Sequence, residues 1–179
     1  MTEKNADLAA LIRNIPDYPK QGIMFRDVST LLLDGVGFRT TIDRLAALVA
    51  PDTTLIAGIE ARGFIVAAGL SYALGLGKLM LRKPGKLPGE KIGTDYALEY
   101  GTDRIEMHVG HVRVGQKVLL VDDLIATGGT ALAGVDLITR AGGVVDQAVF
   151  IVDLPDLGGS KKLKAAGIAV SSLIGFDGD

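Results

Sequence analysis

The stretch VDDLIATGGT, residues Val121 to Thr130, joins two adjacent acids to a turn rich in glycine and threonine. The apolar run before it, Val118 to Val121, predicts a buried strand, and TALAGVDLITRAGG after it carries apolar residues along one helical face. In parallel α/β folds, ligands bind beyond the carboxyl ends of the strands. The stretch therefore predicts a binding site where a strand ends and a helix begins.

The second half of this stretch is suited to binding phosphate. Gly128 and Gly129 have no side chains that would keep a phosphate away from the backbone N–H groups. Thr127 and Thr130 offer hydroxyl donors, and the following helix adds unpaired amides and the positive end of its dipole. An ordinary strand-to-helix turn with Thr130 as its N-cap explains the same residues, so the turn alone leaves both interpretations open.

The two acids, Asp122 and Asp123, point to a sugar as the other part of the ligand. Carboxylates accept hydrogen bonds from neighbouring hydroxyls, and they can hold a hydrated Mg²⁺ directly or through water. A phosphate turn beside two carboxylates therefore fits ribose 5-phosphate, with the acids on the ring hydroxyls. The alternative is a solvated strand end, which is the weaker explanation next to such a turn.

Composition indicates a globular protein with a mostly aliphatic core. The chain has 179 residues, which suits one domain, and 48% of them are hydrophobic while only 5% are aromatic. Its 19 basic and 21 acidic residues give a formal charge of −2, so it lacks the basic surface typical of nucleic-acid-binding proteins. An anionic ligand must therefore be attracted by local charges.

The chain shows no sign of secretion or of membrane insertion. Cysteine is absent, which excludes disulfides and thiolate metal sites. The beginning, MTEKNADLAA, is charged and lacks a long apolar run, and no stretch approaches the roughly 20 apolar residues of a membrane span. We expect a soluble, cytoplasmic protein with neither a membrane nor a nucleic acid as partner.

Apolar runs alternate with helical patterns, which predicts a parallel sheet covered by helices on both faces. The expected strands are Thr54 to Ile59, Lys78 to Arg82, Val118 to Val121, 147–154 and 168–174. The expected helices are Leu8 to Ile12, Ile42 to Val49, 63–74, 130–143 and 159–167. Neither a repeat nor a linker interrupts the pattern, so we expect a single domain over residues 1–179.

Two segments break this alternation. Residues 15–27, IPDYPKQGIMFRD, contain Pro16, Pro19 and Gly22, which predict irregular structure. Lys83 to Arg104 holds two prolines and four glycines. A connection of about 20 residues is unusual in a compact domain and is commonly functional, so we expect a mobile lid or a hairpin there.

Two other phosphate motifs and a histidine metal site can be set aside. A Walker A loop needs Lys and then Ser or Thr after its last glycine, but Thr130 and Ala131 follow Gly129. GLGKLM ends in methionine where a dinucleotide fingerprint needs a third glycine. His108 and His111 stand alone in the sequence, and we expect both at the surface.

VLLVDDLIATGGT closely resembles the 5-phosphoribosyl diphosphate (PRPP) motif of the type I phosphoribosyltransferases. AGIEARGF, residues 57–64, resembles the diphosphate loop of the branch of that family that uses adenine. RKPGKLP (82–88) and YALEYGTD (96–103) resemble the mobile loop of that branch, and PDYPKQGIMFRD (16–27) resembles its base-binding hood. The resemblance covers almost the whole chain in order.

The resemblance implies a type I phosphoribosyltransferase fold, with a small hood over about residues 1–34 and a mobile loop over about 83–104. It implies an enzyme of purine salvage that transfers ribose 5-phosphate from PRPP to N9 of adenine, giving AMP and diphosphate. Mg²⁺ accompanies PRPP in that family, and a homodimer is expected.

The resemblance also assigns roles to residues. The PRPP- and AMP-binding residues are Glu60, Ala61, Arg82, Lys83, Lys86, Asp122, Asp123, Ala126, Thr127, Gly128, Gly129 and Thr130. The adenine-binding residues are Met24, Phe25, Arg26 and Leu124. The expected catalytic residues are Arg62, at the diphosphate, and Glu99, near N7 or N9 of adenine. Asp122 and Asp123 are candidate Mg²⁺ ligands, and the Glu60–Ala61 peptide bond is expected to be cis.

The chemistry of the reaction agrees with these roles. Glycosyl transfer passes through a cation-like state at the anomeric carbon, while negative charge develops on the leaving diphosphate. Arg62, Arg82, Lys83 and Lys86, together with Mg²⁺, would stabilise that charge. A lid over 83–104 would exclude the water that competes with adenine. Without the motifs, these basic residues would be interpreted as solvated loop charges.

Two alternatives remain at this point. One is a transferase for the 6-oxopurines hypoxanthine, guanine or xanthine, against which the IMFRD and RKPGKLP stretches argue. The other is a regulator that binds PRPP without catalysis. Regulators of that kind carry an added DNA-binding domain, for which 179 residues of net negative charge leave no room.

Overall fold

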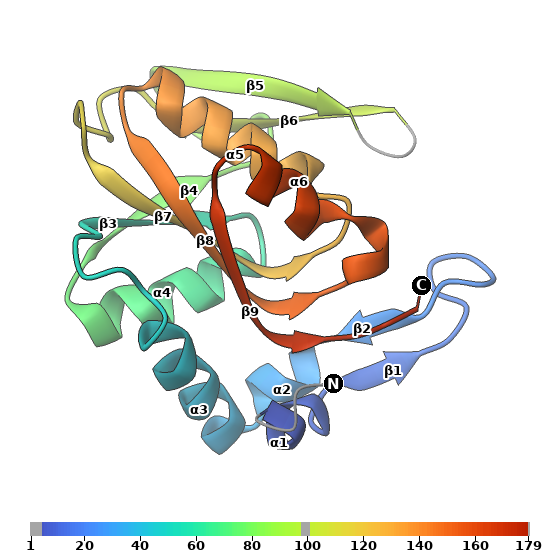
Figure 1. Ribbon diagram of the computed structural model, residues 1–179. Helices are drawn as coiled ribbons and strands as arrows, with labels where there is room; N and C mark the ends of the chain where they lie inside the picture. The colour runs from blue at the N-terminus through green and yellow to red at the C-terminus, as the bar shows by residue number, and fades with distance from the viewer. Residues whose placement is uncertain (1–4, 98–100, 179) are drawn as a thin grey trace.

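A computed structural model gives the structure of the chain and describes residues 5–97 and 101–178. Its centre is a sheet of five strands in the order β4-β3-β7-β8-β9, and every neighbouring pair is parallel (Figure 1). These strands are β3 Leu55–Ile59, β4 Gly77–Leu81, β7 Lys117–Ile125, β8 Val144–Asp153 and β9 Ala169–Gly175. Each apolar run predicted as a strand lies in this sheet, so the expected parallel α/β fold is confirmed.

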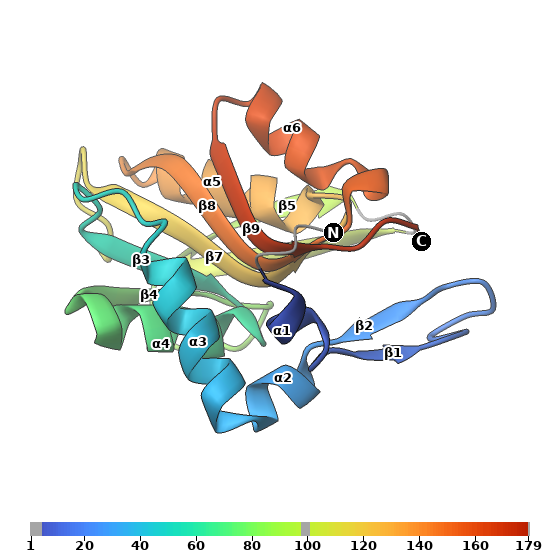
Figure 2. The same ribbon diagram turned by 60° about the horizontal axis from the view of Figure 1, so that its bottom comes forward.

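Helices cover both faces of the sheet (Figures 1 and 2). One face carries α1 Ala6–Ala9, α2 Ser29–Leu33, α3 Gly35–Ala46 and α4 Gly63–Leu74. The other carries α5 Gly129–Arg140, the short 3₁₀ turn η2 Pro155–Leu157 and α6 Gly159–Ala165. Within 5–97 and 101–178, none of these helices is long and apolar enough to cross a membrane.

Strand β7 shows why both faces need a cover. Leu119 and Val121 belong to the core beneath α3 and α4, whereas Val118 and Leu120 belong to the core beneath α5. Successive side chains of a strand point to opposite faces, so an apolar run without alternation is stable only where both faces are buried.

The strand order places a topological switch point between β3 and β7. The chain adds β4 on one side of β3, then crosses to β7 and adds β8 and β9 on the other side. At such a point the loops after the two neighbouring strands diverge, and a crevice opens outside their carboxyl ends. The loop after β3 begins at Glu60, and the turn after β7 begins at Ala126.

The segment expected to be irregular is only partly so. Arg13–Ile15 forms β1 and Phe25–Asp27 forms β2, and the two pair antiparallel with Ile15 opposite Phe25. The expectation was wrong for Ile15 and for Phe25–Asp27, because the prolines and the glycine lie in the connection between the two strands and leave the flanking residues free to pair. The β1–β2 hairpin extends beyond the helical layer (Figure 2).

The long connection after Lys83 forms a hairpin over most of its length. β5 Lys91–Ala97 pairs antiparallel with β6 Thr102–His108, in the register Lys91 to His108. This is one of the two forms expected from the sequence. Residues 98–100, including Glu99, lie outside the described residues.

Three boundaries differ from the sequence prediction for local reasons. β7 continues past Val121 to Ile125, because β8 continues beside it and pairs Asp122 with Phe150. α3 begins at Gly35 because the Asp34 side chain accepts a hydrogen bond from the Gly37 amide, an N-cap that the apolar pattern did not reveal. α5 begins at Gly129, with Gly128 in the N-cap position in place of Thr130.

Candidate active site

An open pocket of about 380 Å³ lies at the switch point, at the carboxyl ends of β3 and β7. Its lining residues are Ile59, Glu60, Ala61, Arg62, Lys83, Asp122, Asp123, Leu124 and Thr130. A smaller hollow of about 120 Å³ shares Asp122, Leu124 and Thr130 with it. Eight of the residues predicted for the site therefore meet in one place, although they come from three separate segments.

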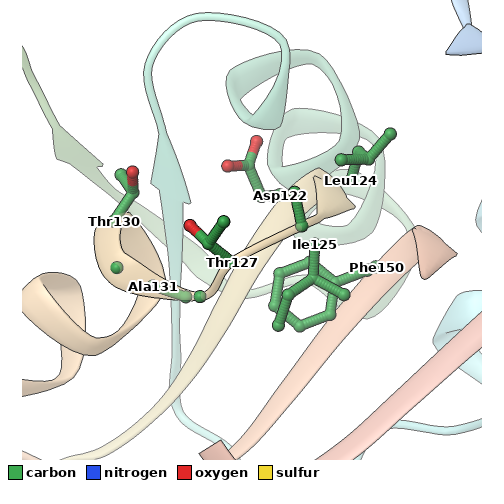
Figure 3. A pocket seen from close by; sticks show the side chains of 10 residues that line it. Asp122, Leu124, Ile125, Thr127, Thr130, Ala131 and Phe150 are labelled. Carbon is green, nitrogen blue, oxygen red and sulfur yellow. The ribbon is translucent and has the colours of Figure 1, made fainter. Parts of the chain in front are cut away.

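The smaller hollow is built by the glycine- and threonine-rich turn. It is lined by Asp122, Leu124, Ile125, Ala126, Thr127, Gly128, Gly129, Thr130, Ala131 and Phe150. In Figure 3 the side chains of Asp122, Thr127 and Thr130 project to one side of the turn, and the Phe150 ring lies on the other side. The first-turn N–H groups of α5 have no partner within the helix, so they add donors to this hollow.

Gly128 must be glycine for two reasons. Its φ is +81°, a left-handed conformation that other residues rarely adopt. A Cβ placed on it would also lie 2.9 Å from Gly159 Cα. The turn is therefore held in a shape that the sequence permits only with glycine.

The two acids of β7 lie in different surroundings although they are neighbours. The Asp123 amide donates a 2.9 Å hydrogen bond to Asp122 Oδ1. Burial, and next the charge of Asp123, raise the pKa of Asp122 well above its usual range. A Cβ on Gly63 would lie 2.7 Å from Asp122 Oδ1, so that glycine lets the start of α4 lie against the acid.

Arg62 pairs with the second acid. Its Nε lies 2.6 Å from Asp123 Oδ2, without the alignment of a normal hydrogen bond. The Asp123 side chain is 7% exposed, whereas that of Arg62 is 42% exposed. The guanidinium carbon also lies 5.8 Å from the centre of the Phe25 ring, which brings the β1–β2 hairpin to the pocket. Arg62 thus links the acids to the hairpin.

The loop after β3 carries the predicted cis peptide bond between Glu60 and Ala61. Glu60 binds Arg82 at 3.2 Å and accepts a 2.8 Å hydrogen bond from the Lys83 amide. Burial alone would raise the pKa of Glu60, but these hydrogen bonds lower it below its usual range. Glu60 therefore holds Arg82 and the backbone of Lys83, two of the residues predicted to bind the diphosphate.

Lys83 lines the pocket and is held by the β5–β6 hairpin. Its ammonium donates a 2.8 Å hydrogen bond to Tyr96 Oη and forms an ion pair with Asp103. Burial would lower the pKa of Lys83, but the bond to Asp103 raises it. The exposed side chain of Lys86 is not part of the pocket lining, and its carbonyl oxygen accepts a 3.1 Å hydrogen bond from Arg82.

The residues predicted to bind adenine are divided between two places. Leu124 lines the pocket, and the Phe25 ring lies beside the guanidinium of Arg62, which also lines it. The Arg26 guanidinium instead binds Asn14 Oδ1 at 2.7 Å and stacks 4.4 Å above the Phe176 ring. Its side chain lines a separate cavity of about 560 Å³ between α1, the hairpin and the C-terminal segment. The side chain of Arg26 thus lies outside the pocket of Leu124, and Met24 immediately precedes β2.

Metal-ligating side chains do not cluster in the part of the chain that the structure describes. Among residues 5–97 and 101–178, no group of three or more His, Asp or Glu side chains is placed to hold a metal ion. His108 and His111 stack with ring centres 4.7 Å apart, and neither is buried. Both lie away from the pocket lining, as expected for surface residues.

Sequence reasoning missed several residues that shape the site. Phe150 lines the smaller hollow from β8, and Gly159 supports the turn from α6. Tyr96 and Asp103 hold Lys83. Tyr96 and Asp103 stand in the YALEYGTD stretch that the family resemblance had marked, whereas Phe150 looked like any apolar strand residue.

Comparison with known proteins identifies the family. The model of the phosphoribosyl transferase domain matches residues 35–170. The adenine phosphoribosyltransferase of Prosthecochloris aestuarii is 57% identical over 171 residues, which cover 94% of this chain and 97% of that protein. The adenine phosphoribosyltransferase of Erythrobacter litoralis is also 57% identical, over 96% of this chain and 97% of its own length.

Solved structures give the same result. The crystal structure of adenine phosphoribosyltransferase from Thermoanaerobacter pseudethanolicus superposes with a TM-score of 0.91 at 47% identity, covering 96% of this chain and 99% of that one. The crystal structure of the enzyme from Giardia lamblia, complexed with 9-deazaadenine, superposes with a TM-score of 0.90 at 34% identity. The match covers 98% of this chain and 99% of that one. The fold is therefore the type I phosphoribosyltransferase fold, and the chain belongs to the phosphoribosyltransferase family, among its adenine phosphoribosyltransferases.

Proposed function

We propose that the chain transfers ribose 5-phosphate from PRPP to N9 of adenine, giving AMP and diphosphate in purine salvage. The observation that carries this proposal is the meeting of the acid pair, the turn and Arg62 at one switch point. This arrangement offers donors for a phosphate, acceptors for two hydroxyls and a cation for a leaving diphosphate. The relatives at 53–57% identity bear the name of that activity.

The ribose 5-phosphate lies across the end of β7. Ala126, Thr127, Gly128, Gly129 and Thr130 bind the 5-phosphate with their amides and hydroxyls. The carboxylates of Asp122 and Asp123 accept hydrogen bonds from the ribose hydroxyls. The acids before the turn thus bind the sugar of the same ligand, at a distance from its phosphate.

The leaving diphosphate binds between the loop after β3 and the start of the β5–β6 connection. Glu60, Ala61 and Arg62 approach it with the loop, and Arg82, Lys83 and Lys86 supply further positive charge. Arg62, Arg82 and Lys83 are paired with Asp123, Glu60 and Asp103. A multivalent anion competes with a single carboxylate for each cation, so we infer that these pairs exchange when PRPP binds.

Adenine binds between Phe25 and Leu124, one on each face of the ring. The backbone of Met24 and Arg26 provides hydrogen bonds to its edge, while the Arg26 side chain stays anchored at Asn14 and Phe176. Adenine presents an N6 donor beside an N1 acceptor, and hypoxanthine reverses that pair, so a mismatched base leaves buried groups unpaired. Glu99 exchanges the proton that adenine loses when its N9 attacks C1′ of the ribose.

Mg²⁺ enters with PRPP in this proposal. Asp122 and Asp123 are the adjacent carboxylates of the pocket, and among the described residues no cage of three ligands surrounds them. Mg²⁺ commonly binds one or two carboxylates, substrate phosphates and water, so this donor set fits an ion that the diphosphate brings. When bound, the ion neutralises charge on the leaving group.

The assembly and the place of the reaction complete the proposal. We propose one domain over 1–179, in which residues 1–34 form a hood over the bound adenine and residues 83–104 close over the site.

The exposed face of α4 is a candidate dimer surface. Ile65 and Tyr72 lie two turns apart on α4, with side chains 45% and 93% exposed, beside the edge strand β4. Such a face suits a second copy of the chain in a homodimer. Phosphorylated substrates place the reaction in the cytoplasm.

The direct test supplies PRPP, Mg²⁺ and adenine and follows both products. The proposal expects AMP and diphosphate in equal amounts, with no product when PRPP is omitted. Binding of PRPP without consumption of adenine would support the regulator instead and contradict the enzyme.

A further inference from the structure

Three consecutive carbonyl oxygens, at the end of β7 and the start of the phosphate turn, are bound by one neighbouring segment. Ile125 O accepts a 3.0 Å hydrogen bond from the Leu154 amide, and Ala126 O accepts one of 2.9 Å from the Gly159 amide. Thr127 O accepts a 3.0 Å hydrogen bond from Lys162 Nζ. Three consecutive carbonyls are thus bound by residues 154–162, the segment that contains η2 and the start of α6.

Gly159 lies closest to the turn. A Cβ on it would lie 2.3 Å from Ala126 O and 2.7 Å from Gly128 N. Real Cβ atoms do not approach other atoms so closely, and the two nearest atoms belong to the backbone, which cannot rotate away as a side chain can. The φ of Gly159 is not in the left-handed region, so the close approach, and not the backbone conformation, requires glycine here.

The opposite face of the turn remains available for a ligand. Within residues 101–178, the amides of Thr127 and Gly128 donate no hydrogen bond to the protein, and those of Gly129 and Thr130 begin α5. Carbonyl oxygens repel a phosphate, and N–H groups attract it. Fixing the carbonyls against α6 therefore directs the N–H groups into the hollow.

We propose that Gly159 is a positioning residue for the 5-phosphate site, and that residues 154–162 keep the N–H groups of the turn directed at the phosphate. Gly159 acts through the turn, because it is not part of the lining of the hollow. Lys162 makes a second, weaker contribution through the Thr127 carbonyl. The inference rests on the proposed function, since it concerns the site assigned to the 5-phosphate of PRPP and AMP.

The test measures the affinities of AMP and adenosine, which differ only in the 5-phosphate, by calorimetry on the full chain. Gly159→Ala should reduce the affinity for AMP at least tenfold, leave that for adenosine within twofold, and raise KM for PRPP more than KM for adenine. Gly35→Ala is the matched control, because a Cβ there meets nothing within 4 Å, and it should leave both affinities unchanged.

A second variant keeps the test decisive if Gly159→Ala does not fold. Lys162→Met removes an exposed donor, and it should weaken AMP about threefold without affecting adenosine. Unchanged AMP affinity in folded Gly159→Ala, or in Lys162→Met when only that variant folds, would overturn the inference. Wild-type protein that does not prefer AMP to adenosine would instead contradict the proposed function.

Discussion

At the scale of single residues, the site holds its charges in pairs. Asp123 faces Arg62, Glu60 faces Arg82, and Asp103 faces Lys83. Each pair compensates a partly buried charge, and under the proposed function an anionic substrate becomes the stronger partner of the cation. Mutation of one acid therefore affects both ligand binding and the position of its cation.

Asp123→Asn keeps the size of the side chain and removes its charge. If Asp123 accepts a hydrogen bond from a ribose hydroxyl and positions Arg62, kcat/KM for PRPP should fall by about 10- to 100-fold, as for a hydrogen bond of about 1.5–3 kcal/mol to a charged group. Steady-state kinetics at varied PRPP give this value. Asp52→Asn, on a carboxylate that is 63% exposed and precedes β3, is the control; equal kinetics of the two variants would remove Asp123 from the site.

Glu99→Gln tests the proposed proton transfer. A positioned carboxyl that takes or gives a proton contributes about 10²-fold or more to the rate, and it should matter little for PRPP binding. Single-turnover measurement of AMP formation should therefore show a slower chemical step at nearly unchanged PRPP affinity. A chemical step as fast as that of the wild type would leave Glu99 without a catalytic role.

At the scale of elements, Asp27 ties the β1–β2 hairpin to the body of the protein. It accepts a 3.0 Å hydrogen bond from the Ser29 amide at the start of α2, and it binds Arg13 of β1 at 2.6 Å. The hydrogen bonds of Ser29 and Arg13 lower the pKa of Asp27 from 3.8 to about 2. The hairpin that carries Phe25 therefore depends on an ionised carboxylate at its base.

This pKa gives a prediction about pH. A lowered pKa stabilises the fold above the unfolded value near 3.8, and that stability is lost as pH falls towards the folded value of about 2. Asp27→Asn should lower the free energy of unfolding at pH 7 by about 2 kcal/mol, measured in urea. The difference in free energy of unfolding between Asp27→Asn and the wild type should be smaller at pH 3 than at pH 7. An equal difference in free energy of unfolding at both pH values would show that the charge of Asp27 does not cause the difference.

The sequence was sufficient for elements whose signals are local and insufficient for those that depend on distant partners. The β7–turn–α5 unit was predictable because VLLV, the acids and the glycines are consecutive. The pairing of Phe25–Asp27 with Arg13–Ile15 was not, because each strand has only three residues and is defined by its partner.

The same limit applies to the site. Family resemblance predicted Asp122, Arg62 and Lys83 for one site, and the three residues line one pocket. It could not show that the Arg26 side chain lies on Phe176, or that Gly159 lies against the turn, because these contacts join residues more than 30 positions apart. Such contacts follow from tertiary packing and leave no periodic pattern in the sequence.

At the scale of the whole molecule, the exposed face of α4 tests the proposed homodimer. Tyr72 is 93% exposed, and a charge in its place would be buried between two copies without a partner. Tyr72→Glu should shift sedimentation of the protein from dimer towards monomer. Val114→Glu is the control, because Val114 is 92% exposed and does not lie on α4, and this variant should sediment like the wild type. A wild-type protein that sediments as a monomer at micromolar concentration would contradict the dimer.

A competition experiment tests whether this pocket makes AMP by selecting adenine. Adenine and hypoxanthine are supplied together at equal concentration with limiting PRPP and Mg²⁺, and the AMP and IMP formed are measured by mass. Because a site built to pair one hydrogen-bonding edge rejects the reversed edge by about 10⁴-fold, AMP should be the sole detectable nucleotide. Comparable amounts of IMP would show that the pocket does not select adenine.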